Sequence, residues 1–489
     1  MKRLLLTAII WLCASTVWAA MPVILVNATG GSDTAASGAG PATALTGSAA
    51  ATDGGGTTVT VDSGADLTGV ATDGSAVIYL IDTTPGHRRF SKITGTNNGA
   101  HTVAVNEAFT GTLSGITWAI GGKRATVGSA TSALLLNNNN AAGDAMPGWA
   151  IEMQSGHTEA DIAANLIFKR AGDVTSGPII LRGTLGAATM PILQFSNNGS
   201  AITTAVGTAI RDFEIKNSNG TKTASYGVNF GTNSMAERMR INDAAKKFFV
   251  GISMGGGGIA VDNEVGNTAS DGIQVGNSQA IGNWIHGCAG HGIGGNGLNN
   301  CIMHNLITGC TGDGIHITTA SNGLAKFYGP VIIGNTVDAN TGDGLEFTAA
   351  STNADVFAGT LIQNNIFSNN TGYGMNFSGA NVNQNTFSAY GCHLRGNVMY
   401  ANGSSNVINS AAPTIADEYP TTTNPTYTST GGNDYSVGSN MKAKGYPAAA
   451  TRTVGIGSST SSYIDPGCAQ RVEPSGSTTY SRSRAVNAQ

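Results

Sequence analysis

The chain has 489 residues, of which 11% are charged and 69 are glycine. Charged residues make up about 25% of an average protein and glycine about 7%, so this composition is typical of a fold with many polar but uncharged turns. The formal net charge is −4, or −4 − 2 = −6 without Lys2 and Arg3, which argues against a nucleic-acid partner.

The first 20 residues have the pattern of a secretory signal peptide. Lys2 and Arg3 precede an apolar run over residues 4–13, and the small residues Ala19 and Ala20 follow. The run is too short to span a bilayer, so we expect an extracellular protein without a membrane span. The alternative is a translation start at Met21, in which case the argument for export disappears and the protein would belong to a virion.

Residues 21–124 are predicted to form a β-rich N-terminal cap. Segments 77–81 and 102–105 have the composition of strands, and turns that contain Gly, Pro or Asn separate them. A cap protects the strand edges at the open end of a solenoid. Residues 125–410 are assigned to the solenoid itself, and within them residues 157–166 are expected to form a short helix or a capping turn.

A short motif recurs between residues 263 and 407. Each copy has Asn, an apolar residue two places later, then a corner Gly, and a further apolar residue ten places after the Asn. Clear copies begin at Asn263, Asn283, Asn305, Asn335 and Asn365, and a weaker copy begins at Asn397. The core length is constant while the spacing varies from 20 to 32 residues, which indicates a repeating coil with loops of different length. Short β segments without a helical period favour a parallel β-helix whose coils stack about 4.8 Å apart.

Stacked coils place equivalent residues in columns. The Asn residues are predicted to form a hydrogen-bonded ladder at a tight turn, and the corner Gly residues are expected to supply backbone freedom. Cys288 and Cys310 each follow a ladder Asn by five places, so they should stack on each other. Both a disulfide and two free thiols are compatible with that position.

The chain after the last clear coil is predicted to close the solenoid over residues 411–470. Segments 424–437 and 463–470 have the character of closing strands. Residues 471–489 are rich in Ser, Thr and Arg and are predicted to be a disordered tail.

One column of side chains is predicted to face outward from the strand that follows each corner Gly. The apolar residues of this strand point inward, so the residue between them points outward; this column consists of Gln274, Gly294, His316, Glu346 and Asn376. His316 and Glu346 should therefore lie about 5 Å apart in adjacent coils.

A second column, directly before the corner Gly, places Asp313 above Asp343. Two stacked carboxylates should have perturbed pKa values or share a cation, for which calcium is the candidate cofactor. A pair at this separation also suits a retaining glycosidase. We predict His316, Glu346, Asp313 and Asp343 as catalytic residues; the alternative is that Asp before Gly is only a favoured turn residue.

Insertions in the later coils are predicted to form a wall beside the outward column. They cover residues 318–329, 348–359 and 378–391 and are rich in aromatic residues. Aromatic rings pack on the C–H faces of sugars, so Tyr328, Phe357 and Tyr390 are predicted to bind substrate together with Gln274 and Asn376. Lys326 is a further catalytic candidate. The alternative is that these aromatic residues pack beneath their own loops.

The Asn-to-Gly coils resemble the repeats of the pectate-lyase-like superfamily, most clearly over about residues 205–410. The resemblance implies a right-handed parallel β-helix but no single function, because the superfamily includes lyases, glycoside hydrolases, phage tailspikes and non-catalytic surface proteins. Of the polygalacturonase motifs only Gly290-His-Gly292 occurs, and it occupies the ordinary turn of the repeat. Asp313, Asp343 and Lys326 match only in part the calcium ligands and the base of a pectate lyase.

Three functions are compatible with the sequence. The first is a secreted protein that binds and cleaves an extracellular polysaccharide as a lyase or a glycoside hydrolase. The second is a non-catalytic surface or adhesive protein, and the third is a tailspike-like virion protein that starts at Met21. The leader favours the first two, and both a monomer and a homotrimer are compatible with the pattern.

Overall fold

The structure of the chain is a computed structural model. The structure describes residues 23–27, 45–53, 55–73, 76–80, 90–106, 108–109, 111–121, 126–127, 150–168, 179–185, 187, 189–218, 225–243, 245, 247–296, 299–319, 329–349, 359–378, 391–409, 415–418, 420–427, 430 and 435. The regular elements of these residues are the strands β1 to β37. The predicted all-β class is therefore confirmed.

Two compact units divide the chain. The first contains Met1–Ala160, Leu166–Leu193 and Thr204–Phe213, and the second contains Asp161–Asn165, Gln194–Thr203 and Glu214–Gln489. Three strands cross the limits of these ranges: β9 (Thr158–Ile162), β12 (Ile192–Phe195) and β13 (Ile202–Thr204).

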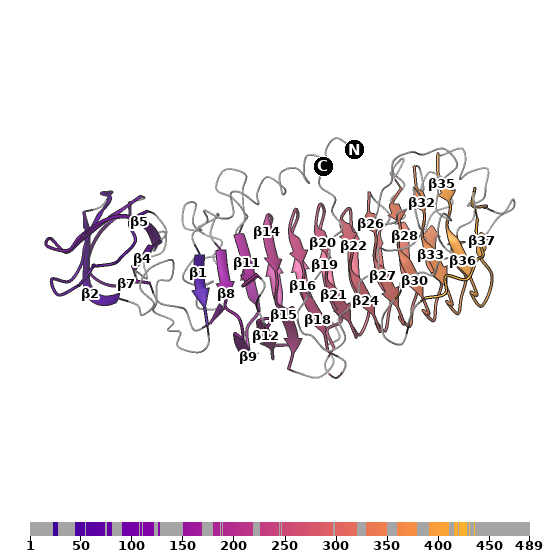
Figure 1. Ribbon diagram of the computed structural model, residues 1–489, viewed down its shortest axis with the longest axis horizontal. Coiled ribbons are helices and arrows are strands. Elements are labelled where there is room, and N and C mark those ends of the chain that lie inside the picture. The colour runs from indigo at the N-terminus through magenta and orange to yellow at the C-terminus, as the bar shows by residue number, and fades with distance from the viewer. Residues whose placement is uncertain are drawn as a thin grey trace. The chain divides into compact units, whose positions relative to one another are not determined.

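A closed antiparallel barrel forms part of the first unit. Its strand order is β2 (Leu45–Asp53), β3 (Thr58–Thr60), β6 (Thr102–Val105), β5 (Phe90–Asn97), β4 (Val77–Leu80) and β7 (Thr112–Ile120), and Figure 1 shows it in indigo and violet. Its core includes Trp118, Phe109 and Ile78, all buried. The Trp118 Nε1–H donates to Asp62 Oδ2 at 2.5 Å, so the one polar atom of this buried ring has a partner.

The first unit also contains parallel strands. β1 (Val23–Val26), β8 (Ala150–Met153), β11 (Ile179–Gly183) and β14 (Thr208–Arg211) pair in that order, and β10 (Leu166–Phe168) lies in the same unit. The prediction of a helix or capping turn over residues 157–166 is wrong, because β9 and β10 occupy most of that segment. The Ile192 N–H donates to the His157 carbonyl at 2.9 Å, so strand pairing overrides the helix propensity of the Glu-Ala-Asp-Ile-Ala-Ala sequence.

The second unit consists of coils that each contribute one strand to three parallel sheets, drawn from magenta to yellow in Figure 1. Sheet one contains β17 (Met235–Glu237), β20 (Ile259–Val261), β23 (Gln279–Ile281), β26 (Cys301–Met303), β29 (Val331–Ile333), β32 (Leu361–Gln363) and β35 (His393–Arg395). Sheet two contains β15 (Glu214–Asn217), β18 (Arg240–Asn242), β21 (Glu264–Gly266), β24 (Trp284–His286), β27 (Leu306–Thr308), β30 (Thr336–Asp338), β33 (Ile366–Ser368) and β36 (Val398–Tyr400). Sheet three contains β16 (Tyr226–Phe230), β19 (Val250–Met254), β22 (Ile273–Gly276), β25 (Ile293–Asn296), β28 (Ile315–Thr319), β31 (Leu345–Ala349), β34 (Met375–Ser378) and β37 (Val407–Asn409). The predicted right-handed parallel β-helix is confirmed.

The core of these coils consists of columns of inward residues. Ile273, Ile293, Ile315, Leu345 and Met375 are fully buried in sheet three, as the ten-residue spacing predicts. The rings of Phe347 and Phe377 stack in adjacent coils with centroids 5.4 Å apart. Column packing of this kind stabilises the fold by about 25 cal/mol for each Å² of apolar surface that it buries. It also holds each coil against its neighbours.

The predicted Asn ladder runs between sheets one and two. Asn335 is typical: its Nδ2 donates to Asn365 Oδ1 and to the Ile302 carbonyl, each at 2.9 Å. Its Oδ1 accepts from the backbone N and the Nδ2 of Asn305, each at 2.9 Å. At the last rung the Asp417 carboxylate accepts from Asn397 N and Nδ2. The sequence pattern did not reveal this cap, because Asp417 lies outside the repeat.

The corner Gly residues have a different role from the one expected. A Cβ on Gly314 would lie 2.1 Å from Val337 Cγ1 and 2.9 Å from the Gly344 carbonyl, and its φ is not in the left-handed region. These positions therefore require Gly because no space exists for a side chain. The left-handed residues are elsewhere in the coil, for example Gly309 and Ala339 with φ of 62° and 56°.

The thiols of Cys288 and Cys310 are free and buried, so the disulfide alternative does not apply. Cys310 N donates to Asn340 Oδ1 at 2.9 Å, which confirms that the cysteines share their column with asparagines. Most of the predicted closing segments, 424–437 and 463–470, lie outside the described residues.

Candidate functional site

The outward face of sheet three carries the polar column that the sequence predicts. In β28 the side chains of Ile315 and Ile317 are buried, while His316 between them is partly exposed. The strand register pairs His316 with Gly294 on one side and with Glu346 on the other. Gln274 and Asn376 occupy the same column one coil farther out in each direction.

A second ladder lies at the corner before sheet three. The side chains there accept backbone N–H groups of the next coil: His291 N donates to Asp271 Oδ1 at 3.1 Å, Asp343 N to Asp313 Oδ1 at 2.7 Å, and Tyr373 N to Asp343 Oδ1 at 2.6 Å. The alternative considered for these aspartates was a local turn bond. The structure instead shows bonds between coils, so Asp313 and Asp343 each use one oxygen to hold the solenoid together.

His316 lies between two carboxylates. Its Nδ1 is 2.9 Å from Asp313 Oδ2 and 2.9 Å from Glu346 Oε2, and its Nε2 is 2.9 Å from Thr318 Oγ1. Hydrogen bonds to Asp313 and Glu346 raise the pKa of His316 to about 9, although burial opposes the shift. The ring is therefore protonated at neutral pH, and its two N–H groups both have acceptors.

The two stacked aspartates differ in acidity. Burial disfavours the charge of Asp313, but hydrogen bonds from His291, from His316 and from the Asp343 N–H outweigh it, so the pKa of Asp313 lies well below its usual range. Burial raises the pKa of Asp343, and the charges of Asp313 and Glu346 raise it further, against the bonds from Tyr373 N and Asn376 Nδ2. Different environments thus separate two carboxylates that the sequence presents as equivalent.

His291 belongs to this cluster and was not predicted as a site residue. Its ring stacks on His316 with centroids 4.2 Å apart and an angle of 25°, and its Nδ1 lies 3.1 Å from both Asp313 Oδ2 and Asp313 N. Gly290-His-Gly292 was interpreted as an ordinary turn. The sequence does contain a signal that identifies His291 as a site residue. In the corner column His291 occupies the coil directly before that of Asp313, so the two side chains must be neighbours.

The carboxylates were predicted as a calcium site. Asp313, Asp343 and Glu346 each offer an oxygen within 4.8 Å of the others, and a second group, with ring nitrogens of His291 and His316 and an oxygen of Asp313, is equally close. Calcium takes six to eight oxygen ligands. Both oxygens of Asp313 and both of Asp343 accept N–H bonds, and the His316 N–H lies between Asp313 and Glu346. Calcium at this cluster therefore stays a prediction, because the ion would have to displace the His316 N–H from these oxygens.

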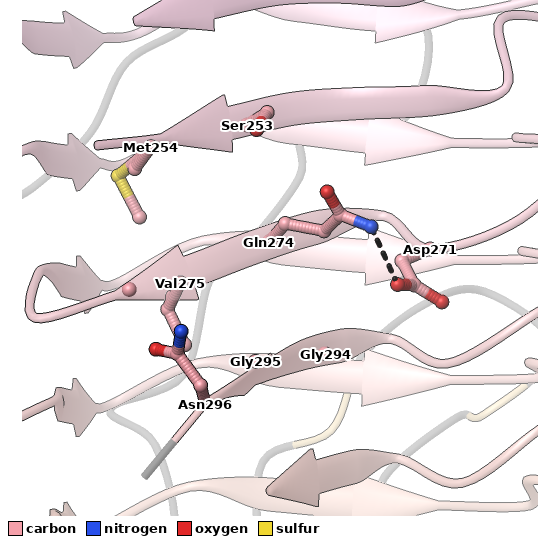
Figure 2. A pocket seen from close by; sticks show the side chains of 9 residues that line it. Ser253, Met254, Asp271, Gln274, Val275, Gly294, Gly295 and Asn296 are labelled. Carbon is pink, nitrogen blue, oxygen red and sulfur yellow. Dashed lines mark hydrogen bonds between the residues drawn. The ribbon is translucent and has the colours of Figure 1, made fainter. Parts of the chain in front are cut away.

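A hollow of about 270 Å³ opens one coil before His316, at Gly294, and Figure 2 shows the side chains that line it. Gly294 presents no side chain in the outward column, and the Asp271 carboxylate, which accepts from Gln274 Nε2 at 3.1 Å, lies over it. The lining residues are Ser253, Met254, Asp271, Gln274, Val275, Gly276, Gly294, Gly295 and Asn296. Asn376, the other predicted binding amide, donates to Asp343 Oδ2 at 2.8 Å.

Four predicted site residues lie outside the described residues: Lys326, Tyr328, Phe357 and Tyr390. The aromatic wall and the lysine therefore stay predictions. The structure brings together His316, Glu346, Asp313 and Asp343 and adds His291 to them.

No family model and no curated protein matches the chain. Among solved structures, the A-module of the mannuronan C-5 epimerase AlgE6 from Azotobacter vinelandii is similar at 11% identity, over 61% of this chain and 94% of that chain, with a TM-score of 0.36. The Dettilon tailspike protein is similar at 14% identity over 58% and 60%, with a TM-score of 0.38, and the pectate lyase Pel9A at 12% identity over 72% and 92%, with a TM-score of 0.36. The fold assignment rests on the strand pairing of this chain itself. Its described residues contain no helix long and apolar enough to cross a membrane.

Proposed function

We propose that the chain binds a polysaccharide along the outward face of sheet three and hydrolyses it at the His316 cluster. The observation that carries this proposal is the contact of His316 Nδ1 with both Asp313 Oδ2 and Glu346 Oε2 at 2.9 Å on an accessible face. The side chains of His316 and Glu346 are 19% and 22% exposed, against 10% for Asp313. Hence His316 and Glu346 are the groups that a substrate can reach.

The acid of this reaction is His316. Its Nε2–H donates to the Thr318 hydroxyl, and Thr318 is exposed on the same face. A glycosidic oxygen that replaces this hydroxyl would receive the Nε2 proton as the bond to the anomeric carbon breaks. Asp313 holds the ring through Nδ1 and keeps it protonated, which is the positioning task of a buried carboxylate.

The nucleophile is Glu346. Its carboxylate attacks the anomeric carbon, and water then releases the sugar by attack on the glycosyl ester, with the neutral His316 ring taking the proton of that water. Close spacing of the acid and the carboxylate is typical of retaining enzymes, in which the groups are about 5–5.5 Å apart, whereas inverting enzymes leave a wider gap for water. The acid and the nucleophile proposed here are in direct contact, with His316 Nδ1 2.9 Å from Glu346 Oε2, which leaves no gap for a water between them and favours retention.

The test is product analysis on a panel of polysaccharides with purified residues 21–489. New reducing ends without unsaturated uronide absorbance, independent of calcium, support the hydrolase. Absorbance from unsaturated uronides that needs calcium would instead indicate a lyase and contradict the proposed roles. The proposed extracellular location rests on the leader over residues 1–20, and N-terminal sequencing of exported protein tests it; a chain found only in particles and starting at Met21 would favour the virion.

A second candidate function is that of a non-catalytic surface rod. Asp313 and Asp343 both contribute to the ladder between coils, which a purely structural solenoid would also need. The two functions differ in what Glu346 does, because this carboxylate bonds the His316 ring and lies beside Asp313, whereas Asp313 and Asp343 accept backbone N–H groups of the next coil. A rod that never cleaves would release no reducing ends either before or after Glu346→Gln.

A further inference from the structure

The outward column is interrupted directly beside the His316 cluster. Gly294 lies between Gln274 and His316 in the strand register, so a coil that would present a side chain presents none. The resulting hollow of about 270 Å³ is slightly below the usual range for ligand pockets, about 300–1,000 Å³. It therefore has room for a single sugar ring rather than for a longer segment.

The Asp271 carboxylate lies over Gly294 at the edge of the hollow, so this position has no room for a side chain. A Cβ on Gly294 would lie 2.7 Å from Asp271 Oδ2. That oxygen accepts from Gln274 Nε2 at 3.1 Å, while Oδ1 accepts from His291 N. The carboxylate is thus fixed in one orientation at the wall of the hollow, with lone pairs left to accept hydroxyl groups.

The charge around the hollow is negative. Asp271, Asp313 and Glu346 lie on or beside this face, and His316 contacts the last two of them. The next outward column consists of Asn296, Thr318, Thr348 and Ser378, which are uncharged. Among the residues that the structure describes on this face there is no Lys or Arg. A sugar with its own carboxylate would meet like charge here at short range, which costs binding energy.

We propose that the hollow at Gly294 binds one residue of a neutral polysaccharide and rejects a uronate residue. This inference rests on the proposed function, because it places that sugar next to His316 and Glu346. Asp271, Gln274 and Asn296 supply the acceptors and donors for its hydroxyl groups. The substrate class is therefore a neutral glycan and not a pectate-type or alginate-type uronan.

Affinity electrophoresis of the full chain tests this inference. The gels contain soluble β-glucan, xyloglucan or galactomannan as neutral polymers, and polygalacturonate or alginate as uronans. Three variants report on the hollow: Gly294→Val pushes the Asp271 carboxylate aside and narrows the hollow, Gln274→Ala removes a donor without adding atoms, and Asp271→Asn removes the charge. Gly64→Val, at a glycine with open space around it, and Gln363→Ala, on sheet one, are the matched controls.

The expected result is retardation of the wild type by at least one neutral polymer and by neither uronan. Gly294→Val and Gln274→Ala should raise the apparent Kd for that polymer at least tenfold and a few fold respectively, while the controls leave it unchanged. Asp271→Asn should retain neutral binding and gain measurable retardation by a uronan. Circular dichroism on each variant verifies that it is folded, and Gln274→Ala keeps the test valid if Gly294→Val does not fold.

Three outcomes would overturn the inference. Stronger retardation by a uronan than by any neutral polymer would refute the substrate class while leaving the proposed function standing. Neutral binding that is unchanged in both Gly294→Val and Gln274→Ala would show that the hollow is not a subsite. Absence of retardation by every polymer would remove the inference and the proposed function together.

Discussion

The Nδ1 atom of His316 lies 2.9 Å from Oε2 of Glu346 in the adjacent coil. Strand pairing alone places their backbones at the distance between neighbouring strands, about 4.8 Å. The closer approach of the side chains requires a proton between them, and the raised pKa of His316 supplies it. A protonated imidazole held by two carboxylates is therefore built into the outward face of the solenoid.

The free energy of unfolding should decrease as the pH rises from about 6.5 to about 9. The pKa of His316 is raised from 6.5 to about 9 in the folded chain, so folding favours the protonated ring; this contribution is complete below pH 6.5 and is lost above pH 9. We expect a loss of about 1–2 kcal/mol, less than the full 1.36 kcal/mol per pKa unit, because solvent screens a partly exposed ring. Urea unfolding at several pH values measures it, and His316→Gln should flatten the alkaline part of the curve.

The substitution Asp313→Asn should lower the pKa of His316. Asp313 is the strongest of the groups that raise this pKa, and an amide cannot stabilise the imidazolium to the same extent. Titration of the ring by NMR gives the value directly, with an expected fall from about 9 toward 6.5. Asp271→Asn is the control, because Asp271 contacts His291 N and Gln274 rather than His316. An unchanged His316 pKa in Asp313→Asn would contradict the assigned bond.

The ladder variant Asn335→Ala should be strongly destabilised. The side chain is fully buried and makes four hydrogen bonds, so its removal leaves several buried groups without partners at about 1–3 kcal/mol each. We expect a loss of about 3 kcal/mol or more in urea unfolding. Asn376→Ala, which removes one bond at a partly exposed position, should cost less than about 1 kcal/mol. Equal losses of unfolding free energy in the two variants would mean that the ladder stabilises the fold no more than a single bond at the surface does.

The corner glycine variant Gly314→Ala should be more destabilising than Gly309→Ala. The new Cβ of the first would overlap Val337 and approach the Gly344 carbonyl, which costs about 1–3 kcal/mol or more in a packed core. The second position has open space and a φ of 62°, and Ala339 occupies the equivalent place in the next coil, so its cost should be about 1 kcal/mol. A lower melting temperature for Gly309→Ala than for Gly314→Ala would contradict this explanation and would support the expectation that the corner glycine supplies backbone freedom.

The sequence is sufficient to predict the features that repeat. Asn263 and its equivalents recur at a fixed distance from an inward apolar residue, so the ladder, the core columns and the pairing of His316 with Glu346 follow from counting. Asp417, which caps the ladder, and the strand order of the barrel belong to no repeat, so the spacing of the repeat does not predict them.

The chemistry of the cluster depends on side-chain positions, and the spacing of residues along the sequence does not predict these. The sequence places Asp313 and Asp343 in one column as equivalents, yet His291 and His316 contact the first and not the second. The corner glycines show the same limit, because Gly314 is needed for a contact with the next coil rather than for its own φ. Helix propensity over residues 157–166 failed because strand pairing between coils decides the local structure.

The most direct test of the proposed hydrolysis is the initial rate of reducing-end release by Glu346→Gln on the neutral polysaccharide that the wild type degrades fastest. Glu418→Gln is the matched control, because Glu418 forms a similar contact with His393 at 2.9 Å on a different sheet. Because Glu346 is the proposed nucleophile, Glu346→Gln should lower the rate by about 10⁴–10⁶-fold, while Glu418→Gln should retain it. Equal rates for the two variants, or no release by the wild type on any polymer, would contradict it.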